Sequence, residues 1–494
     1  MNKHICNPFL PLSEYIPDGE PHVFGDRVYL YGSHDKEGGE TFCMLDYTVW
    51  SAPVDDLTDW RCEGVSYRAQ QDPGYPIRRY MYAPDVVQGN DGRYYLFYCM
   101  SGDKGQGGYF GPISVAVSDS PAGPFAYHGF VRFEDGSPMQ KYVPFDPAVI
   151  NDGGTIRLYY GTQYDYEEQP GFGAEQLTEE VKMFGKTEEE ITGTPESVMG
   201  ANMLVLADDM LTVKEGPVRI IPYRVKGTGF EAHPFFEGAS IRKIGETYYF
   251  IYSSQQNNEL CYATSKQPDK DFVFRGVIVN TGDVGIHGRE PHERLNLTGT
   301  THGSIEQIGG KWYVFYHRLT HKSDYSRQAC AEQIEILPDG SIPQVEVTSC
   351  GLNGGALPTE GTYPAAIACN ITNGAMPHCP NATFPVALPH VTHAENAAGE
   401  TERFIAQIGE RTFIGYKYFD FKGGETLTIT YRSKLDGRFF VMNESSEEVG
   451  MIELLPSEDW TQASCRLSMA PGVHPLYLVY IVPGEVALKD LSFS

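Results

Sequence analysis

One short phrase recurs five times in this chain: a Gly or Asp-Gly turn followed by a run of aromatic and aliphatic residues. The copies begin at Gly25, Asp91, Gly153, Gly245 and Gly309. Glycine supplies the positive φ that a tight hairpin needs, and the run that follows suits a strand buried on both faces. A spacing of roughly 60–90 residues exceeds a solenoid repeat but fits one four-stranded blade with long loops. The repeat therefore predicts a five-bladed β-propeller.

The pattern changes beyond the last repeat, so the propeller is expected to occupy residues 1–350. Residues 351–402 are rich in Gly, Pro, Asn and Ala, which is typical of a linker crossing between domains. Short alternating strands from 403 to 494 predict an antiparallel β-sandwich or jelly roll. Inside the propeller, apolar residues at helical spacing predict a helical insertion near 174–199. The fold class is therefore all-β, a five-bladed propeller followed by a sandwich.

The charge of the chain indicates which partners are unfavourable, and its cysteines indicate the cellular compartment. The formal net charge is −27, which disfavours nucleic acid and anionic membranes as partners. No apolar run is long enough to span a membrane, and the N-terminal residues lack the apolar segment of a signal peptide. The 10 Cys show no C-x-x-C spacing, as expected of free thiols in a reducing cytoplasm. We therefore expect a cytoplasmic protein, although a chain trimmed of its signal peptide would look the same.

Three acidic residues stand at the starts of predicted blades: Asp18 before the first, Asp146 before the third and Glu237 before the fourth. The inner strands of a propeller line its axis, so these side chains are expected to converge. Glycosidic cleavage usually needs one protonated carboxyl to donate to the leaving oxygen and one ionised carboxylate to activate water. A third acid can raise the pKa of the proton donor. An acid beside Pro or Gly is more often a turn former, but Glu237 is not a turn residue type.

These segments resemble glycoside hydrolase family 43, whose members are five-bladed propellers acting as α-L-arabinofuranosidases, β-xylosidases and arabinanases. The resemblance rests on the Asp18 segment, Tyr82-Ala83-Pro84-Asp85-Val86, Phe145-Asp146-Pro147, Phe236-Glu237-Gly238-Ala239-Ser240 and His302-Gly303-Ser304. It implies an inverting mechanism with Asp18 as general base, Glu237 as general acid and Asp146 tuning and orienting that acid. The family usually reads Asp-Pro at the first acid, whereas Pro17 precedes it here, so Glu20 is the alternative base.

The resemblance also implies roles for residues around the acids. Tyr82 stands where many relatives have Trp and would contact the sugar together with Phe236. Arg327 matches an arginine of the fifth blade that reaches the site, where its fork can bind sugar hydroxyls and steady the carboxylates; the alternative is a surface salt bridge. His302 matches an axial histidine near a central cation, which implies a structural calcium ion. Calcium prefers oxygen ligands, so the alternative is a hydrogen-bonded structural histidine, and the chemistry itself requires no cofactor.

The end of the chain resembles a family 6 carbohydrate-binding module, through the segments Phe413 to Phe421 and Ala487 to Phe493. Such modules usually carry an aromatic residue where this chain has Leu491. Stacking platforms supply much of the sugar affinity of these modules, so we expect a packing role against the propeller.

The expected function is that of an exo-acting glycosidase that trims pentoses from plant cell-wall oligosaccharides. An α-L-arabinofuranosidase is the first expectation, and a β-D-xylosidase of the same family is the alternative. A non-catalytic sugar-binding propeller would have lost at least one of the three acids. A protein-interaction propeller would leave all three unexplained.

Overall fold

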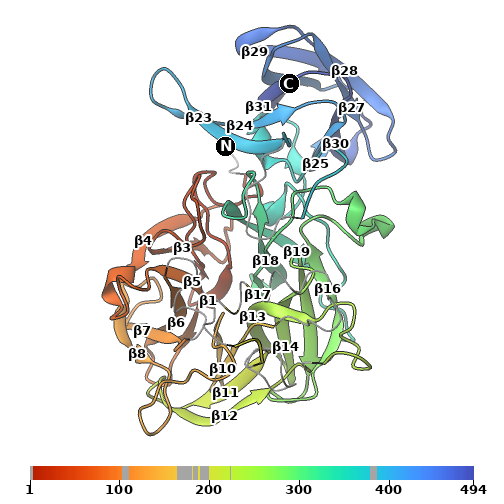
Figure 1. Cartoon of the computed structure of the whole chain (residues 1–494). Helices are drawn as coiled ribbons and strands as arrows, with labels where there is room; N and C mark the ends of the chain where they lie inside the picture. Colours follow the sequence, from red (N-terminus) through yellow and green to blue (C-terminus); the bar gives the residue numbers. More distant parts are fainter. Residues whose placement is uncertain are drawn as a thin grey trace.

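The computed structural model describes residues 4–102, 111–163, 178, 181, 187–189, 200–222, 224–378 and 387–494. Five sheets form a ring, and two further sheets form a separate layered domain at the C-terminal end (Figure 1). Four sheets of the ring have four strands and the fifth has three. The predicted propeller followed by a β-sandwich is confirmed.

The blades follow one another along the chain. The first contains β1 (Glu20–Phe24), β2 (Arg27–Tyr31), β3 (Tyr47–Pro53) and β4 (Arg61–Tyr67). The second contains β5 (Tyr80–Gln88), β6 (Tyr94–Ser101), β7 (Ser114–Ser118) and β8 (Ala126–Phe130). The third contains β9 (Ala148–Asp152), β10 (Thr155–Tyr160), β11 (Asn202–Leu206) and β12 (Val213–Arg219). The fourth contains β13 (Phe235–Ile244), β14 (Thr247–Ser254), β15 (Glu259–Ser265) and β16 (Val273–Asn280), and the fifth contains β17 (Ser304–Ile308), β18 (Lys311–Leu319) and β19 (Arg327–Ile334).

The repeated phrase forms the second strand of every blade, and its burial on both faces has a simple cause. In β14, Tyr248, Phe250 and Tyr252 pack into a core shared with the third blade. The alternate residues Tyr249 and Ile251 pack into a core shared with the fifth blade. Successive side chains of a strand point to opposite faces, so a strand between two blades needs apolar residues at every position.

The inner strands close the ring. Strand β1 contacts β17 on one side and β5 on the other, and β9 and β13 complete the circle. Gly19 and Gly303 form a parallel bridge between the first and fifth blades. All five inner strands therefore begin at the same end of the propeller, where their first residues meet.

The N-terminal segment borders the three-stranded fifth blade. The backbone N–H of Phe9 donates to the carbonyl of Ala329 at 3.2 Å. The Asn7 side chain donates to the Ala331 carbonyl at 2.9 Å and accepts from the Ala331 N–H at 3.1 Å. Phe9 also packs against Phe315 and Trp60. The start of the propeller sequence is thereby joined to its last blade.

Two packed sheets make up the C-terminal domain. One has the order β20-β25-β30-β27-β28, with β22 also on β25, and the other has the order β23-β24-β31-β26-β29, with β21 on β31. The first sheet comprises β20 (Leu357–Pro358), β22 (Asn370–Thr372), β25 (Thr412–Phe421), β27 (Gly437–Met442), β28 (Glu448–Leu454) and β30 (Gly472–Tyr480). The second comprises β21 (Gly361–Pro364), β23 (His390–Glu395), β24 (Thr401–Ile408), β26 (Thr426–Ser433), β29 (Ser457–Arg466) and β31 (Val486–Phe493).

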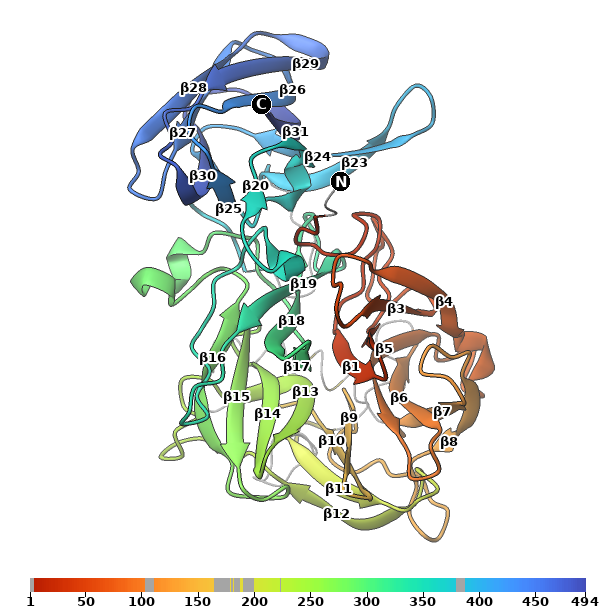
Figure 2. The ribbon, with the colours of Figure 1, turned by 180° about the vertical axis from the view of Figure 1, so that it is seen from behind.

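The predicted linker, residues 351–402, is corrected by these pairings. Strands β20, β21, β22 and β23 all lie within it and are hydrogen-bonded into the two sheets. Figure 2 shows β20 beside β25 at the junction between the domains. The segment resembles a linker in sequence because its strands are short and rich in turn residues. The partners of β20, β21 and β22 lie up to 132 residues away, beyond the reach of local patterns, whereas β23 pairs with its neighbour β24.

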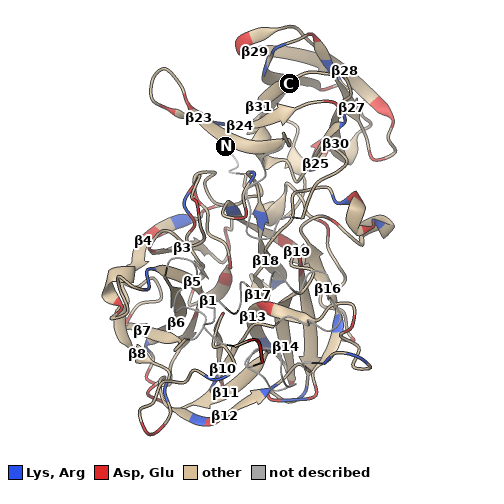
Figure 3. Cartoon of the chain, in the orientation of Figure 1, with Lys and Arg blue, Asp and Glu red and all other residues tan. Residues whose placement is uncertain are grey.

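Most of the predicted helical insertion at 174–199 lies outside the described residues. Short 3-10 helices occur at Ala69–Gln71, Ile286–Gly288, Pro291–Glu293, Gly351–Asn353 and Ala365–Ile367. None of the helices in the described part of the chain has the length and apolar character that a bilayer crossing requires. Acidic residues appear on the outer loops and strands of both domains and also near β1 and β13 at the centre of the ring (Figure 3).

Candidate active site

Residues from every blade meet where the inner strands begin. Asp18 precedes β1, Asp146 precedes β9, and His302 precedes β17. Tyr82 is near the start of β5, and Glu237 is the third residue of β13. The structure therefore brings Asp18, Asp146 and Glu237 together: His302 Nδ1 lies 3.9 Å from oxygens of both aspartates, and the N–H of Gly238, next to Glu237, donates to Asp146.

Asp18 is buried and held by two basic side chains of the fifth blade. Its backbone lies in the left-handed region, with φ of 58°, which Asp tolerates better than most residues. The Arg327 guanidinium donates through one nitrogen to both carboxylate oxygens of Asp18, at 3.0 and 3.1 Å. The Asp18 N–H donates to Nδ1 of His317 at 3.2 Å. The predicted reach of Arg327 into the site is thus present, and the alternative of a surface salt bridge does not apply.

Arg327 is the cation that keeps Asp18 ionised. Burial raises the pKa of Asp18, but Arg327, followed by His317 and His302, lowers it below its ordinary value. His317 accepts from Asp18 through Nδ1 and faces the Thr300 carbonyl through Nε2 at 3.0 Å. Burial lowers the pKa of His317 to about 3, so this imidazole is neutral at neutral pH. The guanidinium therefore provides the compensating positive charge.

Asp146 and Glu237 have the opposite electrostatic environment. Burial, followed by the charge of Glu237, raises the pKa of Asp146 well above its ordinary value. Burial, followed by the charge of Asp18, raises the pKa of Glu237 to about 8. Glu237 is also more exposed than the two aspartates. One acid of the cluster is thus poised as a proton acceptor and another as a proton donor.

A bulge in β13 orients Glu237. The pairing register of β13 with β14 shifts on both sides of Glu237, and Gly238 has a φ of 70°. The Gly238 N–H donates to Asp146 at 3.0 Å. A Cβ at this position would lie 3.1 Å from the His302 ring, so glycine suits both the conformation and the space. Bulges beside active sites commonly re-aim a side chain in this way.

Glu20, the alternative base, lies in a different environment. Its carboxylate accepts from Arg242 at 3.0 Å, and Asp85 and His22 lie within ligand distance of it further along the axis. Burial, followed by the charge of Asp85, outweighs Arg242 and raises the pKa of Glu20 to about 7. A carboxyl bound to Arg242 is separate from the cluster around Arg327, so the geometry favours Asp18.

The aromatic candidates flank the acids. The Tyr82 ring is partly exposed and lies 5.7 Å from the Phe145 ring, next to Asp146. Its hydroxyl accepts from Ser101 at 3.0 Å, which fixes the ring. Phe236 is buried, and its carbonyl accepts from the Gln163 N–H at 2.8 Å. Tyr82 can thus present a face to a sugar, whereas the buried Phe236 side chain supports the strand that carries Glu237.

His302 lies between two of the acids. Its Nδ1 is 3.9 Å from oxygens of both Asp18 and Asp146, while its Nε2 is buried without a hydrogen-bond partner. Calcium takes six to eight oxygen ligands. Among the described residues, His302 belongs to none of the groups whose ligand atoms lie close enough to share an ion. The side chains around His302 do not fit a calcium shell, so no step is assigned to a metal.

Sequence patterns missed the residues that support Arg327. Asp35, which follows the first repeat, accepts from Arg327 at 2.8 and 2.9 Å. The Phe42 ring lies 4.6 Å below the guanidinium carbon. His317 is the other missed residue and lies near the end of β18. A charged or polar residue at or shortly after the end of a buried repeat strand was the available signal, because those strand ends meet at the same end of the ring.

Comparisons with known proteins agree with this geometry. The model of "Glycosyl hydrolases family 43" matches residues 5–342. A xylosidase/arabinosidase of Thermoclostridium stercorarium is 43% identical over 504 residues, which cover 100% of this chain and 99% of that protein. A xylosidase/arabinosidase of Bacteroides ovatus is 31% identical over 354 residues, which cover 68% of this chain and 97% of that protein.

A solved structure is similar over the propeller. It is a family 43 β-xylosidase/α-arabinofuranosidase from a compost microbial metagenome, in complex with xylotriose and in a calcium-free form. The TM-score is 0.52 at 28% identity, and the match covers 68% of this chain and 97% of that one.

Proposed function

The chain belongs to family 43 of the glycosyl hydrolases, and we propose that it removes terminal pentoses from plant cell-wall oligosaccharides with inversion of configuration. The opposite pKa shifts of Asp18 and Glu237 within one buried cluster carry this proposal. Inverting glycosidases need one ionised and one protonated carboxyl at the same pH.

In the proposed mechanism, Asp18 is the general base. Its carboxylate takes a proton from a water molecule, which attacks the anomeric carbon on the face opposite the leaving group. Arg327 keeps Asp18 ionised before attack and holds its carboxylate in place.

Glu237 is the general acid and donates its proton to the departing glycosidic oxygen. Burial and the charge of Asp18 favour the protonated state of this acid, and Asp146, by accepting from the Gly238 N–H, holds the backbone beside it. Each turnover leaves Asp18 protonated and Glu237 ionised, and exchange with solvent restores both.

The substrate class follows from the relatives and from the shape of the sugars. Both similar curated proteins are described as xylosidase/arabinosidase, and the similar solved structure holds xylotriose. Arabinofuranose and xylopyranose present similar hydroxyls, so one site with Tyr82 as a stacking face can accept both. We propose activity on α-L-arabinofuranosides and on β-D-xylosides.

The test is hydrolysis of 4-nitrophenyl α-L-arabinofuranoside and 4-nitrophenyl β-D-xyloside, singly and mixed. With each substrate at a saturating concentration, one shared site predicts that the mixed rate lies between the two single rates and that Asp18→Asn abolishes both. Asn keeps the shape and tolerates the left-handed conformation of this position, so lost turnover reports the base. Additive rates in the mixture, or full activity of Asp18→Asn, would contradict the proposal.

For the C-terminal domain we propose packing and not sugar capture. Leu491, at the position where carbohydrate-binding modules carry an aromatic residue, is fully buried in the sandwich core. A core leucine offers no stacking face to a sugar ring. Strong binding of the intact protein to xylan that survives saturation of the propeller site would contradict this role.

We propose a reducing compartment as the working place of the protein. The nine cysteines in the described residues are free thiols, and several are buried in blade cores. The enzyme would then meet short imported oligosaccharides instead of polymeric xylan. Fractionation of the source cells, followed by an activity assay of each fraction, tests this location.

A further inference from the structure

The C-terminal domain contacts the propeller through the β23–β24 hairpin, at two loops close to the acid cluster. The Val391 N–H donates to the Thr320 carbonyl at 3.0 Å in the β18–β19 loop. Arg403 of β24 donates to both carboxylate oxygens of Glu37, at 3.1 and 2.8 Å, in the β2–β3 loop. Both side chains of this ion pair are only 18% exposed. The pair is therefore shielded from water more than a typical surface pair.

These two loops also carry the residues that hold Asp18. Asp35 lies two residues before Glu37, and Arg327 begins β19 directly after the other loop. Arg327 is bound to Asp35 through two nitrogens and to Asp18 through the third. Hydrogen bonds thus link Arg403 to Glu37 and link Asp35 through Arg327 to Asp18, and the short loop segment between Glu37 and Asp35 joins the two sets.

Tyr15 provides a second link between the hairpin contact and the acid cluster. Its hydroxyl donates to Glu37 at 3.1 Å, and its carbonyl accepts from the Asp35 N–H at 2.9 Å. Tyr15 lies three residues before Asp18 on the same segment. Movement of Glu37 would therefore disturb Asp18 from two directions.

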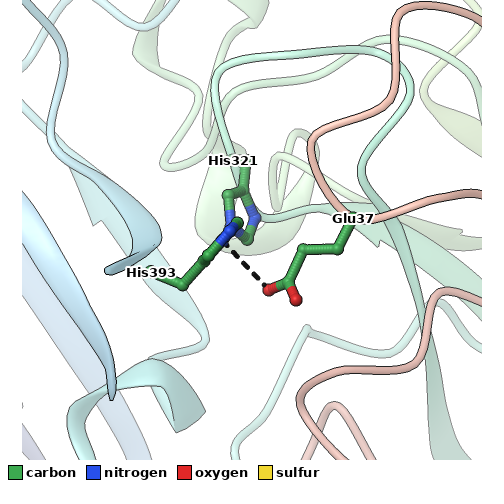
Figure 4. A group of neighbouring side chains, drawn as sticks. All are labelled: Glu37, His321 and His393. Atoms are coloured by element: carbon green, nitrogen blue, oxygen red, sulfur yellow. Dashed lines mark ion pairs between the residues drawn. The ribbon is translucent and has the colours of Figure 1, made fainter. Parts of the chain in front are cut away.

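Two histidines complete the contact, and their arrangement resembles a metal site. Figure 4 shows His393 of the hairpin directed at Glu37 with His321 beside it, and the ligand atoms of all three residues lie within 4.8 Å of one another. Both oxygens of Glu37 are already bound by the Arg403 guanidinium, which a divalent cation would have to displace. Burial lowers the pKa of His321 to about 3, so it adds no charge at neutral pH. The cluster is best explained as the Arg403–Glu37 ion pair, flanked by the neutral imidazole of His321 and the partly exposed imidazole of His393.

We propose that Arg403 is a positioning residue for the reaction: its ion pair with Glu37 holds the β2–β3 loop so that Asp35 keeps Arg327 on Asp18. The C-terminal domain then contributes to catalysis without touching the sugar. This inference rests on the proposed role of Asp18 as general base. The β23–β24 hairpin would then position a catalytic group in addition to packing against the propeller.

The test compares Arg403→Gln and Glu37→Gln in the full-length protein. We expect kcat to fall on the order of tenfold in each, because displacements near 1 Å strongly impair catalysis, while KM changes little. The acidic limb of the kcat/KM profile should move to higher pH, since Asp18 loses part of the charge that keeps it ionised. The double variant should be no worse than either single variant, because both break one link. Arg403→Lys, which keeps the charge but not the fork, should recover part of kcat.

Tyr418→Phe is the matched control. It removes another hydrogen bond between the domains, from the Tyr418 hydroxyl to Glu346 at 2.7 Å, on a strand that does not touch the two loops. We expect it to lower the melting temperature slightly and to leave kcat and the acidic limb unchanged. Wild-type kcat and an unmoved acidic limb in both Arg403→Gln and Glu37→Gln would overturn the inference. Activity in Asp18→Asn would instead overturn the proposed base itself, which keeps the two failures distinct.

Discussion

At the scale of single residues, Arg327 serves two buried carboxylates with one positive charge. Asp35 takes two of its nitrogens and Asp18 the third. Burial raises the pKa of Asp35 in spite of Arg327, whereas the pKa of Asp18 stays below its ordinary value. The guanidinium is thus anchored by Asp35 and directed at Asp18. The geometry needs a rigid fork with several donors, which only arginine provides.

Replacing Arg327 by Lys tests this division of roles. A lysine ammonium cannot bind both aspartates in the same geometry, so Asp18 should lose stabilisation of its ionised form and its pKa should rise. The base must be ionised, and activity is lost as the pH falls through its pKa. The acidic limb of kcat/KM should therefore move to higher pH, together with a fall in kcat on the order of a hundredfold. An unchanged acidic limb would show that Arg327 does not set the charge of Asp18.

Glu237→Gln tests the proton donor. An activated phenolate needs little protonation to depart, so activity on 4-nitrophenyl glycosides should partly survive while activity on xylo-oligosaccharides nearly vanishes. In the wild-type protein, kcat/KM should decline as the pH rises through about 8, because the acid must be protonated. The variant should lack this basic limb. Equal losses on both substrate types would remove Glu237 from the acid role.

At the scale of elements, the second strands of the blades were predictable and the edge contacts were not. Each repeat strand can be predicted from its apolar residues at every position. These occur because the strand lies between two hydrophobic cores, as β14 does. Strands β20, β21 and β22 carry no such signal, since each is short and pairs with a strand far along the chain, whereas β23 forms a hairpin with the next strand, β24. Convergence of Asp18, Asp146 and Glu237 followed from blade geometry. Asp35 and His317 were missed because a single polar residue near the end of a strand has many ordinary explanations.

The N-terminal segment joins the first and fifth blades, and loss of its contacts should lower the stability of the propeller at this junction. Asn7 is fully buried and also donates to Glu332 at 2.9 Å and to the Thr348 carbonyl at 3.1 Å. Asn7→Ala removes this partner from the Thr348 carbonyl and from the Ala331 N–H and carbonyl, while Glu332 keeps Tyr316 and Thr348. The loss should cost about 2 kcal/mol of folding free energy. The measurement is the melting temperature, with Asn353→Ala at an exposed turn as control. Equal melting temperatures for the two variants would contradict the closing role of Asn7.

At the scale of the whole molecule, the two domains are joined by buried polar contacts. Arg318 of the fifth blade donates to the carbonyls of Cys369 and Ala368, and Lys417 of β25 pairs with Asp283 at 2.9 Å and Glu346 at 2.7 Å. Such partners cannot be removed without leaving buried charges unpaired. These contacts hold the C-terminal domain firmly against the propeller that carries the acid cluster.

Removing the chain from residue 357 onward should consequently lower solubility and melting temperature far more than it changes retention on xylan. The truncation exposes Arg318 and Asp283, whereas the buried Leu491 offers no stacking surface to lose. The comparison needs a thermal melt and an affinity gel with and without xylan. A stable truncated propeller that has lost polysaccharide retention would contradict the structural role of the second domain.

The central claim is that Asp18 activates water while Glu237 protonates the leaving oxygen. Its most direct test is ¹H NMR of the first sugar released from 4-nitrophenyl β-D-xyloside, recorded before mutarotation. Attack by water opposite the leaving group predicts that α-D-xylose appears first and that the β-anomer grows in later. Release of β-D-xylose as the first product would mean a covalent intermediate on one of the acids and would contradict the assignment of Asp18 as a base.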